Sequence, residues 1–169
     1  MPNLVLDQER VEFLRARSST KMALLPAWPR PQKELRVVEV EVNWVRFSTL
    51  NHRTKAEQLR VIHDLKRPDL FTADPLGNDA QQAQYKILRG QAGFEDLKDD
   101  LQVRHQQEYA VISAEGVLIN GNRRAAALRS LFYDDHVLDA KYLRCLLLPE
   151  IRRSLVLAVP FMSVKTEPR

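Results

Sequence analysis

The segment that decides the fold of this chain is GVLINGNRRAAAL, residues 116–128. Its apolar start, residues 117–119, favours a short strand, and the alanine-rich end that begins at Arg123 favours a helix. Gly121 stands between them, where a residue without a Cβ allows a tight turn. A second apolar run, residues 109–112, precedes the segment and is separated from it by a turn signal. The sequence therefore predicts a β-hairpin that leads directly into a helix.

The junction between that strand and that helix is positively charged. Arg123 and Arg124 fall in the first helical turn, where a cation opposes the helix dipole and a bound anion would reverse the cost. Asn120 or Asn122 is expected to cap the helix with its side chain. The pattern favours a phosphate site formed by Gly121, Asn122, Arg123 and Arg124. The alternative is that both arginines are solvated or pair with acidic side chains elsewhere.

Segments on both sides of this junction extend the pattern. Alternating valines at residues 38–42 predict a strand, an arginine follows within residues 51–54, and residues 94–101, 108–112 and 141–149 are further segments with apolar side chains. With the Gly-Asn-Arg-Arg box at residues 121–124, this order resembles the ParB/sulfiredoxin superfamily, in particular its ParB-like N-terminal and ParB-like nuclease domains, which have a strand, an arginine loop, a helix, a strand and a closing strand in these places. The resemblance covers about residues 35–150. It implies an α+β fold, a small mixed sheet flanked by helices, here with a helical N-terminal extension.

The resemblance also implies a function. It places Arg53 beside the box as a further phosphate ligand and makes His52 the candidate acid or base. We therefore expect a DNA-associated module that binds phosphate groups of DNA or of a nucleotide, such as CTP or ATP with Mg²⁺. Two alternatives stay open: a ParB-fold nuclease or NTPase, and a protein-interaction domain that has no ligand.

Two departures from the family boxes limit the expected chemistry. Asn122 stands where ParB-like proteins carry glutamate, so turnover is not expected, because an amide neither accepts a proton nor attracts Mg²⁺. Asn122 also stands where sulfiredoxins carry their cysteine. The single cysteine of this chain, Cys145, lies in an apolar run where burial disfavours the thiolate. Sulfiredoxin chemistry is therefore not expected.

The chain divides into three parts by composition. Residues 1–33 are expected to form a helix and a proline-rich connector, and residues 34–150 the ParB/sulfiredoxin-like domain. Residues 151–169 read as the start of a C-terminal helical region that Pro160 interrupts. We therefore expect an N-terminal part of a longer protein, which could form a homodimer through the region that is missing.

Helical periodicity predicts two further helices inside the domain. In residues 55–65 the apolar side chains Ala56, Leu59 and Ile62 are expected to face inward. In residues 80–89 the inward side chains are expected to be Ala83, Ile87 and Leu88. A group of acids, Glu95, Asp96, Asp99 and Asp100, is expected to form a solvated helix face.

Composition bounds the class of protein. The 169 residues are 44% hydrophobic and 28% charged, with a net charge of +4, which suits a globular domain with a polyanionic partner such as DNA. The four histidines and one cysteine lack metal-ligand spacing, so neither zinc, nor haem, nor another metal site is expected. No run is long enough for a membrane span, and no signal peptide is recognised, so a cytoplasmic protein without a membrane partner is expected.

Overall fold

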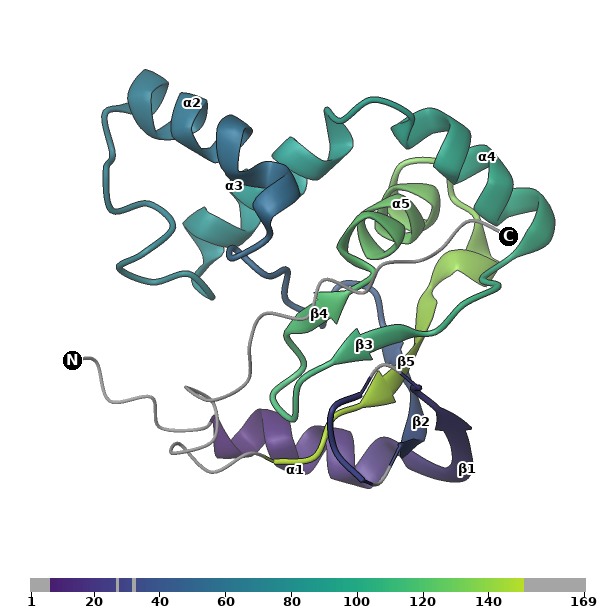
Figure 1. The fold of residues 1–169 in the computed structure, drawn as a ribbon. Helices are drawn as coiled ribbons and strands as arrows, with labels where there is room; N and C mark the ends of the chain where they lie inside the picture. Colours follow the sequence, from purple (N-terminus) through teal and green to yellow (C-terminus); the bar gives the residue numbers. More distant parts are fainter. Residues whose placement is uncertain (1–6, 27, 32, 151–169) are drawn as a thin grey trace.

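The computed structural model describes residues 7–26, 28–31 and 33–150, and it confirms the predicted α+β class. A mixed sheet forms the centre, with helices packed around it (Figure 1). Its strands are β1 (Ser18–Leu24), β2 (Glu34–Glu41), β3 (Ala110–Ile112), β4 (Leu118–Asn120) and β5 (Tyr142–Leu147). The helices are α1 (Gln8–Arg17), η1 (His52–Thr54), α2 (Lys55–Leu65), α3 (Asn78–Arg89), α4 (Phe94–Arg104), α5 (Asn122–Tyr133) and η2 (Leu138–Ala140). The expected helical region at 151–169 lies outside the described residues.

The strand order is β1-β2-β5-β3-β4. All neighbouring strands are antiparallel except β3 and β5, which run parallel because α5 crosses over between them. The predicted hairpin is present as β3 and β4, and the predicted closing strand is β5 at the centre of the sheet. The crossover therefore places the amino end of α5 at the end of β4.

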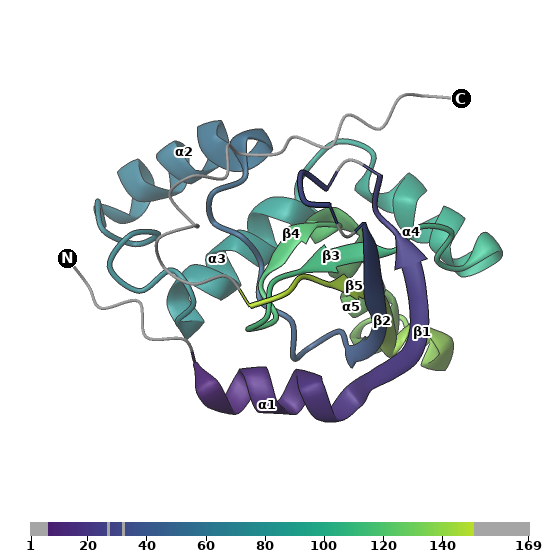
Figure 2. The ribbon, with the colours of Figure 1, turned by 60° about the horizontal axis from the view of Figure 1, so that its bottom comes forward.

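The sequence analysis did not predict strand β1. Residues 18–24 were expected to belong to a helix and connector, whereas they pair antiparallel with β2 and form an edge of the sheet (Figure 2). An edge strand with mostly exposed side chains lacks the alternation that identifies a strand in a sequence. The preceding helix is as expected, and its apolar side chains Val11 and Leu14 are buried.

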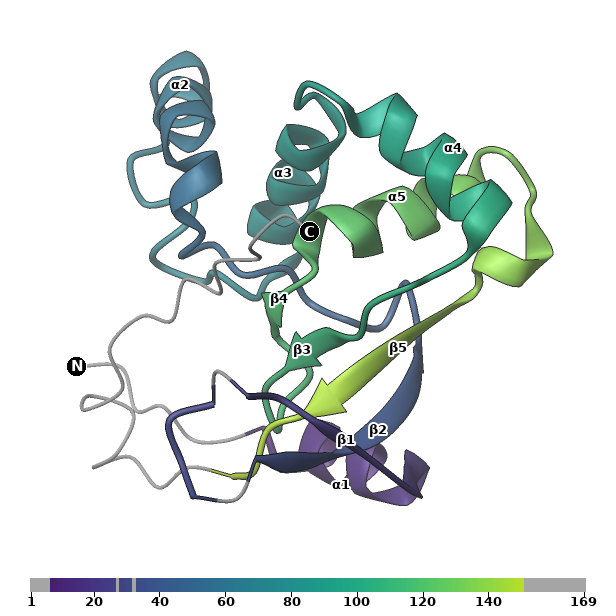
Figure 3. The same cartoon turned by 45° about the vertical axis from the view of Figure 1, so that its right-hand side comes forward.

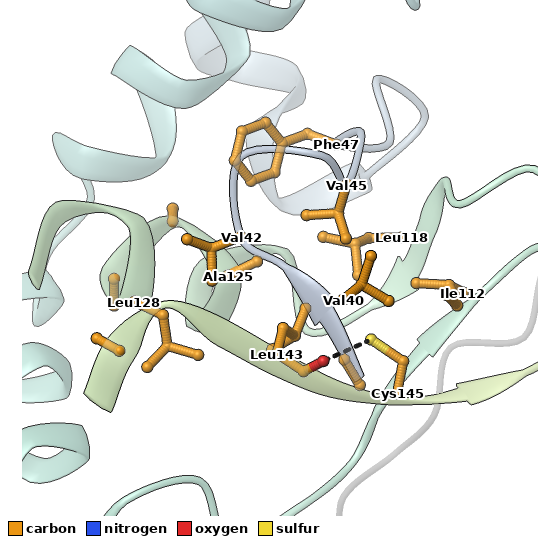
Figure 4. Close-up of a cluster of buried hydrophobic side chains, with 14 of the residues drawn as sticks. Val40, Val42, Val45, Phe47, Ile112, Leu118, Ala125, Leu128, Leu143 and Cys145 are labelled. Atoms are coloured by element: carbon orange, nitrogen blue, oxygen red, sulfur yellow. Dashed lines mark hydrogen bonds between the residues drawn. The ribbon is translucent and has the colours of Figure 1, made fainter. Parts of the chain in front are cut away.

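The main core lies between the sheet and α5 (Figure 4). Val38, Val40 and Val42 face it, and Glu39 between them is exposed, as the alternation in this strand predicts. From α5 the core receives alanines, whose small side chains let the helix approach the strands closely. Burial of these apolar side chains is the main force that holds α5 on the sheet.

The opposite face of the sheet carries a second apolar cluster. Trp28 is 5% exposed and packs with Val37 and Leu146, so the proline-rich connector is folded onto the domain. Within the described residues, no helix combines the length and the apolar character needed to cross a bilayer.

Of the three side chains predicted to face inward from α2, Ile62 is partly buried against an apolar cluster, whereas the other two are not buried. Leu59 is 55% exposed and Ala56 is also exposed, whereas the polar Gln58 is buried. The reason is a hydrogen bond. The carbonyl of Thr49, in the irregular segment before the helix, accepts from the Gln58 amide at 2.8 Å, and this bond draws Gln58 inward. Helix α3 agrees better with the prediction, because Ile87 and Leu88 are buried.

Candidate functional site

The candidate site is built on a glycine at the amino end of α5. Gly121 has φ +92°, in the left-handed region, and a Cβ at this position would lie 2.8 Å from the Cβ of Ala110. Both the conformation and the space therefore require glycine. Gly121 is the N-cap of α5 and supplies no side-chain cap, so the expected cap by Asn120 or Asn122 is wrong.

The backbone at this helix end retains donors for a ligand. The first intrahelical bond runs from the N–H of Ala125 to the carbonyl of Gly121, at 2.9 Å. The N–H groups of Asn122, Arg123 and Arg124 precede it, and the helix dipole gives this end a partial positive charge. The strand-to-helix turn thus presents backbone N–H groups in the manner expected of an anion site.

The side chain of Asn122 is used inside the protein. Asn122 is 5% exposed, its Oδ1 accepts from the N–H of Ser48 at 2.9 Å, and its Nδ2 donates to the carbonyl of Leu118 at 3.3 Å. It therefore ties α5 to β4 and to the segment after β2. A glutamate here would place a carboxylate in a buried position and could not donate to Leu118.

Arg123 and Arg124 occupy the first turn of α5 as predicted, but their side chains contact different parts of the protein. Arg123 donates from Nη2 to the carbonyl of Ala92, at 2.9 Å, in the linker between α3 and α4. Its Nε is buried and has no hydrogen-bond partner among the described residues. An unpaired buried donor is costly, and an acceptor that reached this N–H would remove that cost.

Arg124 is held by Glu108, which lies two residues before β3. It donates to the carbonyl of Glu108 at 3.2 Å, and its Nη2 lies 3.5 Å from the Glu108 carboxylate. Burial lowers the pKa of the Arg124 guanidinium from its ordinary value, and the carboxylate of Glu108 acts in the opposite direction. The alternative of pairing with an acid therefore applies to Arg124. Arg123 instead contacts the backbone carbonyl of Ala92.

Arg53 and His52 lie in η1, and both are exposed. The side chain of Gln91 donates to the carbonyl of Arg53 at 3.2 Å, and Gln91 directly precedes Ala92, the partner of Arg123. The α3–α4 linker thus joins η1 to the amino end of α5. The structure places Arg53 and Arg123 along the same linker, whereas Arg124 faces the start of β3.

Two glutamines of α3, the buried Gln84 and the partly buried Gln81, hold the segment from Phe47 to Thr54, and their role was not predicted from the sequence. Gln84 donates to the hydroxyl of Thr54 at 3.0 Å and to the carbonyl of Ser48 at 3.2 Å. Gln81 accepts from the N–H of Phe47 and donates to its carbonyl. These amides act as pairing partners for a segment outside the sheet. The available signal was a polar residue, Gln84, on the helix face that also carries Ile87 and Leu88.

Other chemically relevant groups lie away from this helix end. The acids of α4 form a mostly solvated face as expected, with Asp100 paired to Arg104 at 2.6 Å. Among the residues described, no group of three or more His, Cys, Asp or Glu side chains is arranged to hold a metal ion. Cys145 is buried, as expected, and its burial raises the pKa of the thiol to about 12.

These features outline a positively charged corner with unused donors. Backbone N–H groups of α5 and the Nε of Arg123 contribute to it, and the exposed Arg53 is linked to it through the bond from Gln91 to the Arg53 carbonyl. Such a set can bind an anion by charge-assisted hydrogen bonds. Comparison of the chain with protein-family models, with curated proteins and with solved structures finds no match.

Proposed function

We propose that the chain is a ParB-like, DNA-associated module that binds a phosphate group of a nucleotide or of DNA at the amino end of α5. The observation that carries the proposal is the buried Nε of Arg123, which has no partner among the described residues and lies beside a helix end with no side-chain cap. A phosphate oxygen accepts hydrogen bonds strongly and carries the charge that the helix dipole and the arginine favour.

The contacts of each residue support distinct roles. Gly121 permits the turn, and the Asn122 amide fixes it through Ser48 and Leu118. The side chain of Asn122 is therefore not needed as a ligand. Arg123 is the main side-chain donor, and Arg53, whose backbone carbonyl accepts from Gln91 of the same linker, is the proposed second cation. Arg124 supports the helix through Glu108.

The same contacts favour binding over turnover. Asn122, which follows Gly121, has a side-chain amide that is hydrogen-bonded to backbone groups. No carboxylate at this position therefore activates water. His52 stays the candidate acid or base on its sequence position alone. CTP and ATP, each with Mg²⁺, and duplex DNA are the ligands to compare.

Calorimetric titration of the full chain with CTP, ATP, GTP and a short DNA duplex tests the proposal. One of these ligands should bind, and Arg123→Gln should weaken its binding roughly tenfold or more, because a charge-assisted hydrogen bond is lost. Arg104→Gln is the matched control, since it removes the same charge from the far end of α4 and should leave affinity unchanged.

Three outcomes would count against the proposal. Absence of binding by all four ligands would favour a protein-interaction domain. Equal losses for Arg123→Gln and Arg104→Gln would indicate an unspecific charge effect. Release of product with a divalent metal, abolished by His52→Ala, would favour the nuclease or NTPase alternative.

A further inference from the structure

A cavity of about 350 Å³ lies at the other end of α5, away from the phosphate site. Its wall includes Leu101 and Gln102 from the last turns of α4 and Leu128 and Leu131 from the second half of α5. The beginning of β5 closes it, beside the end of α4 (Figure 3). The volume is within the range of cavities that hold small organic ligands.

The cavity has an apolar floor. Leu101, Leu128, Leu131 and Ala140 line it, and each is at most 5% exposed. These side chains belong to the main core, so the floor is rigid. A ligand that entered the cavity would bury an apolar part against it.

The rim of the cavity is negatively charged. Glu39 and Asp139 line it, both are exposed, and neither has an ion-pair partner among the described residues. The acids that directly follow α5 differ, because Asp134 pairs with Arg89 at 3.2 Å and Asp135 with Lys98 at 2.7 Å. Two unpaired carboxylates therefore face one opening.

Two helix ends add to this negative potential. Helices α4 and α5 both direct their carboxyl ends toward the cavity, and the carboxyl end of a helix carries a partial negative charge. The last turn of α5 holds no basic residue, and the Arg104 side chain at the end of α4 is paired with Asp100. The field at the cavity therefore favours a cation.

The wall of the cavity also includes a cation, Arg144, and a residue with a strained backbone, His105. Arg144 is the cross-strand partner of Glu39; its guanidinium donates to the carbonyl of Gln106 and keeps its positive charge, so two carboxylates are set against one guanidinium in the lining. His105, which ends α4, has φ +60° and ψ −170°, a conformation that costs a residue other than glycine about 1–3 kcal/mol. Such strain is concentrated at ligand sites.

We propose that this cavity binds a primary ammonium group carried on an apolar stem. The stem contacts the leucine floor, and the ammonium lies at the rim between Glu39 and Asp139. Tyr142, which is 48% exposed, lines the same opening, but the Nζ of Lys141 already lies 5.4 Å from its ring centroid, so the carboxylates and not this ring are the proposed ligands of the ammonium. The proposal is independent of phosphate binding at the amino end of α5.

Titration of the ¹⁵N-labelled full chain with hexylammonium tests the proposal by NMR. Amide resonances of residues 101–106 and 137–144 should shift in a saturable way. Neutral hexanol and anionic hexanoate, which share the stem, should bind more weakly in that order, because only the ammonium complements the rim. The proposal would be overturned if hexanol bound as tightly as hexylammonium or if hexanoate bound more tightly than hexylammonium. It would also be overturned if hexylammonium caused no saturable shift.

Charge variants separate a specific site from general attraction. Asp139→Asn and Glu39→Gln should each weaken hexylammonium binding roughly threefold, as expected for exposed charge pairs. Asp139→Lys should abolish it, and because this side chain is exposed the fold should be retained. Asp96→Asn, on the exposed side of α4, is the matched control and should change nothing. Equal effects of Asp139→Asn and Asp96→Asn would contradict the assignment. Arg123→Gln should leave this binding intact.

Discussion

The two ends of α5 carry opposite charge, and each has the same sign as the helix dipole beside it. At the amino end, where the dipole is positive, Arg123 and Arg124 lie in the first turn. At the carboxyl end, where it is negative, the unpaired carboxylates of Glu39 and Asp139 border a cavity. Like charges at a helix end are mildly destabilising, so both ends become more stable when a counter-ion binds. This opposition of charge is the basis of the two proposals, an anion at the amino end and an ammonium at the carboxyl end of one buried helix.

The protein satisfies the two ends by different means. The arginines bind backbone carbonyls, those of Ala92 and Glu108, so the amino end is tied to its neighbours by directed bonds. The carboxyl end packs apolar side chains and leaves its rim acids open. Substitutions at the amino end should therefore affect folding or binding according to the contact that each removes, while rim substitutions should affect binding alone.

The largest effect is expected for Gly121→Ala. The alanine would have to adopt φ +92°, and its Cβ would lie 2.8 Å from the Cβ of Ala110. We therefore expect a loss of about 2–4 kcal/mol in the free energy of unfolding. Gly90→Ala is the control, because φ is −82° there and the nearest atom is 3.5 Å away, and it should change stability by less than about 1 kcal/mol. Urea unfolding measures both. Similar losses for the two variants would show that the turn is not specific to Gly121.

The next effect concerns Asn122→Ala. It leaves the N–H of Ser48 and the carbonyl of Leu118 without their partner, so it should cost about 2 kcal/mol of stability. Asn120→Ala, at a partly exposed position at the end of β4, should cost less than about 0.5 kcal/mol. Thermal unfolding followed by circular dichroism is a suitable measurement. An unchanged transition in Asn122→Ala would mean that this amide does not hold the segment after β2 to α5.

A smaller effect separates the two arginines. Arg124→Gln should lower the free energy of unfolding by about 1 kcal/mol, because the bonds to Glu108 are lost, and should weaken phosphate binding only slightly. Arg123→Gln should show the reverse, with affinity lost and stability kept. Paired unfolding and titration curves give both quantities. The division of roles fails if Arg124→Gln weakens binding more than Arg123→Gln does.

The smallest effect is the response to salt. Raising salt from about 50 to about 200 mM should weaken binding at the amino end about threefold for each phosphate that the protein neutralises. Hexylammonium at the carboxyl end should respond less, because contact with the apolar floor is not screened. Titrations at several salt concentrations yield the two slopes. A steeper slope for hexylammonium would contradict an apolar contribution at the cavity.

Local patterns account for the elements that were predicted correctly. The apolar run before Gly121 and the alanines after it specify a strand, a turn and a helix through contacts within a few residues. The alternation around Glu39 and the burial of Cys145 follow from the same kind of signal. Arg123 and Arg124 were placed in the first turn of a helix for this reason.

Contacts between distant segments decided the rest. Strand β1 exists because β2 offers it a pairing edge, and α2 buries Gln58 rather than Leu59 because the carbonyl of Thr49 needs a donor. A sequence pattern records neither demand.

The sequence by itself determined the α+β class, the hairpin, and the position of two arginines at the start of α5. Only the tertiary structure decided that Arg124 is occupied by Glu108, that Arg123 keeps a buried donor, and that two helix ends meet over an apolar cavity. The physical reason is that secondary structure depends on neighbours along the chain, whereas the partner of a charge depends on which distant backbone and side-chain groups the packed core brings beside it.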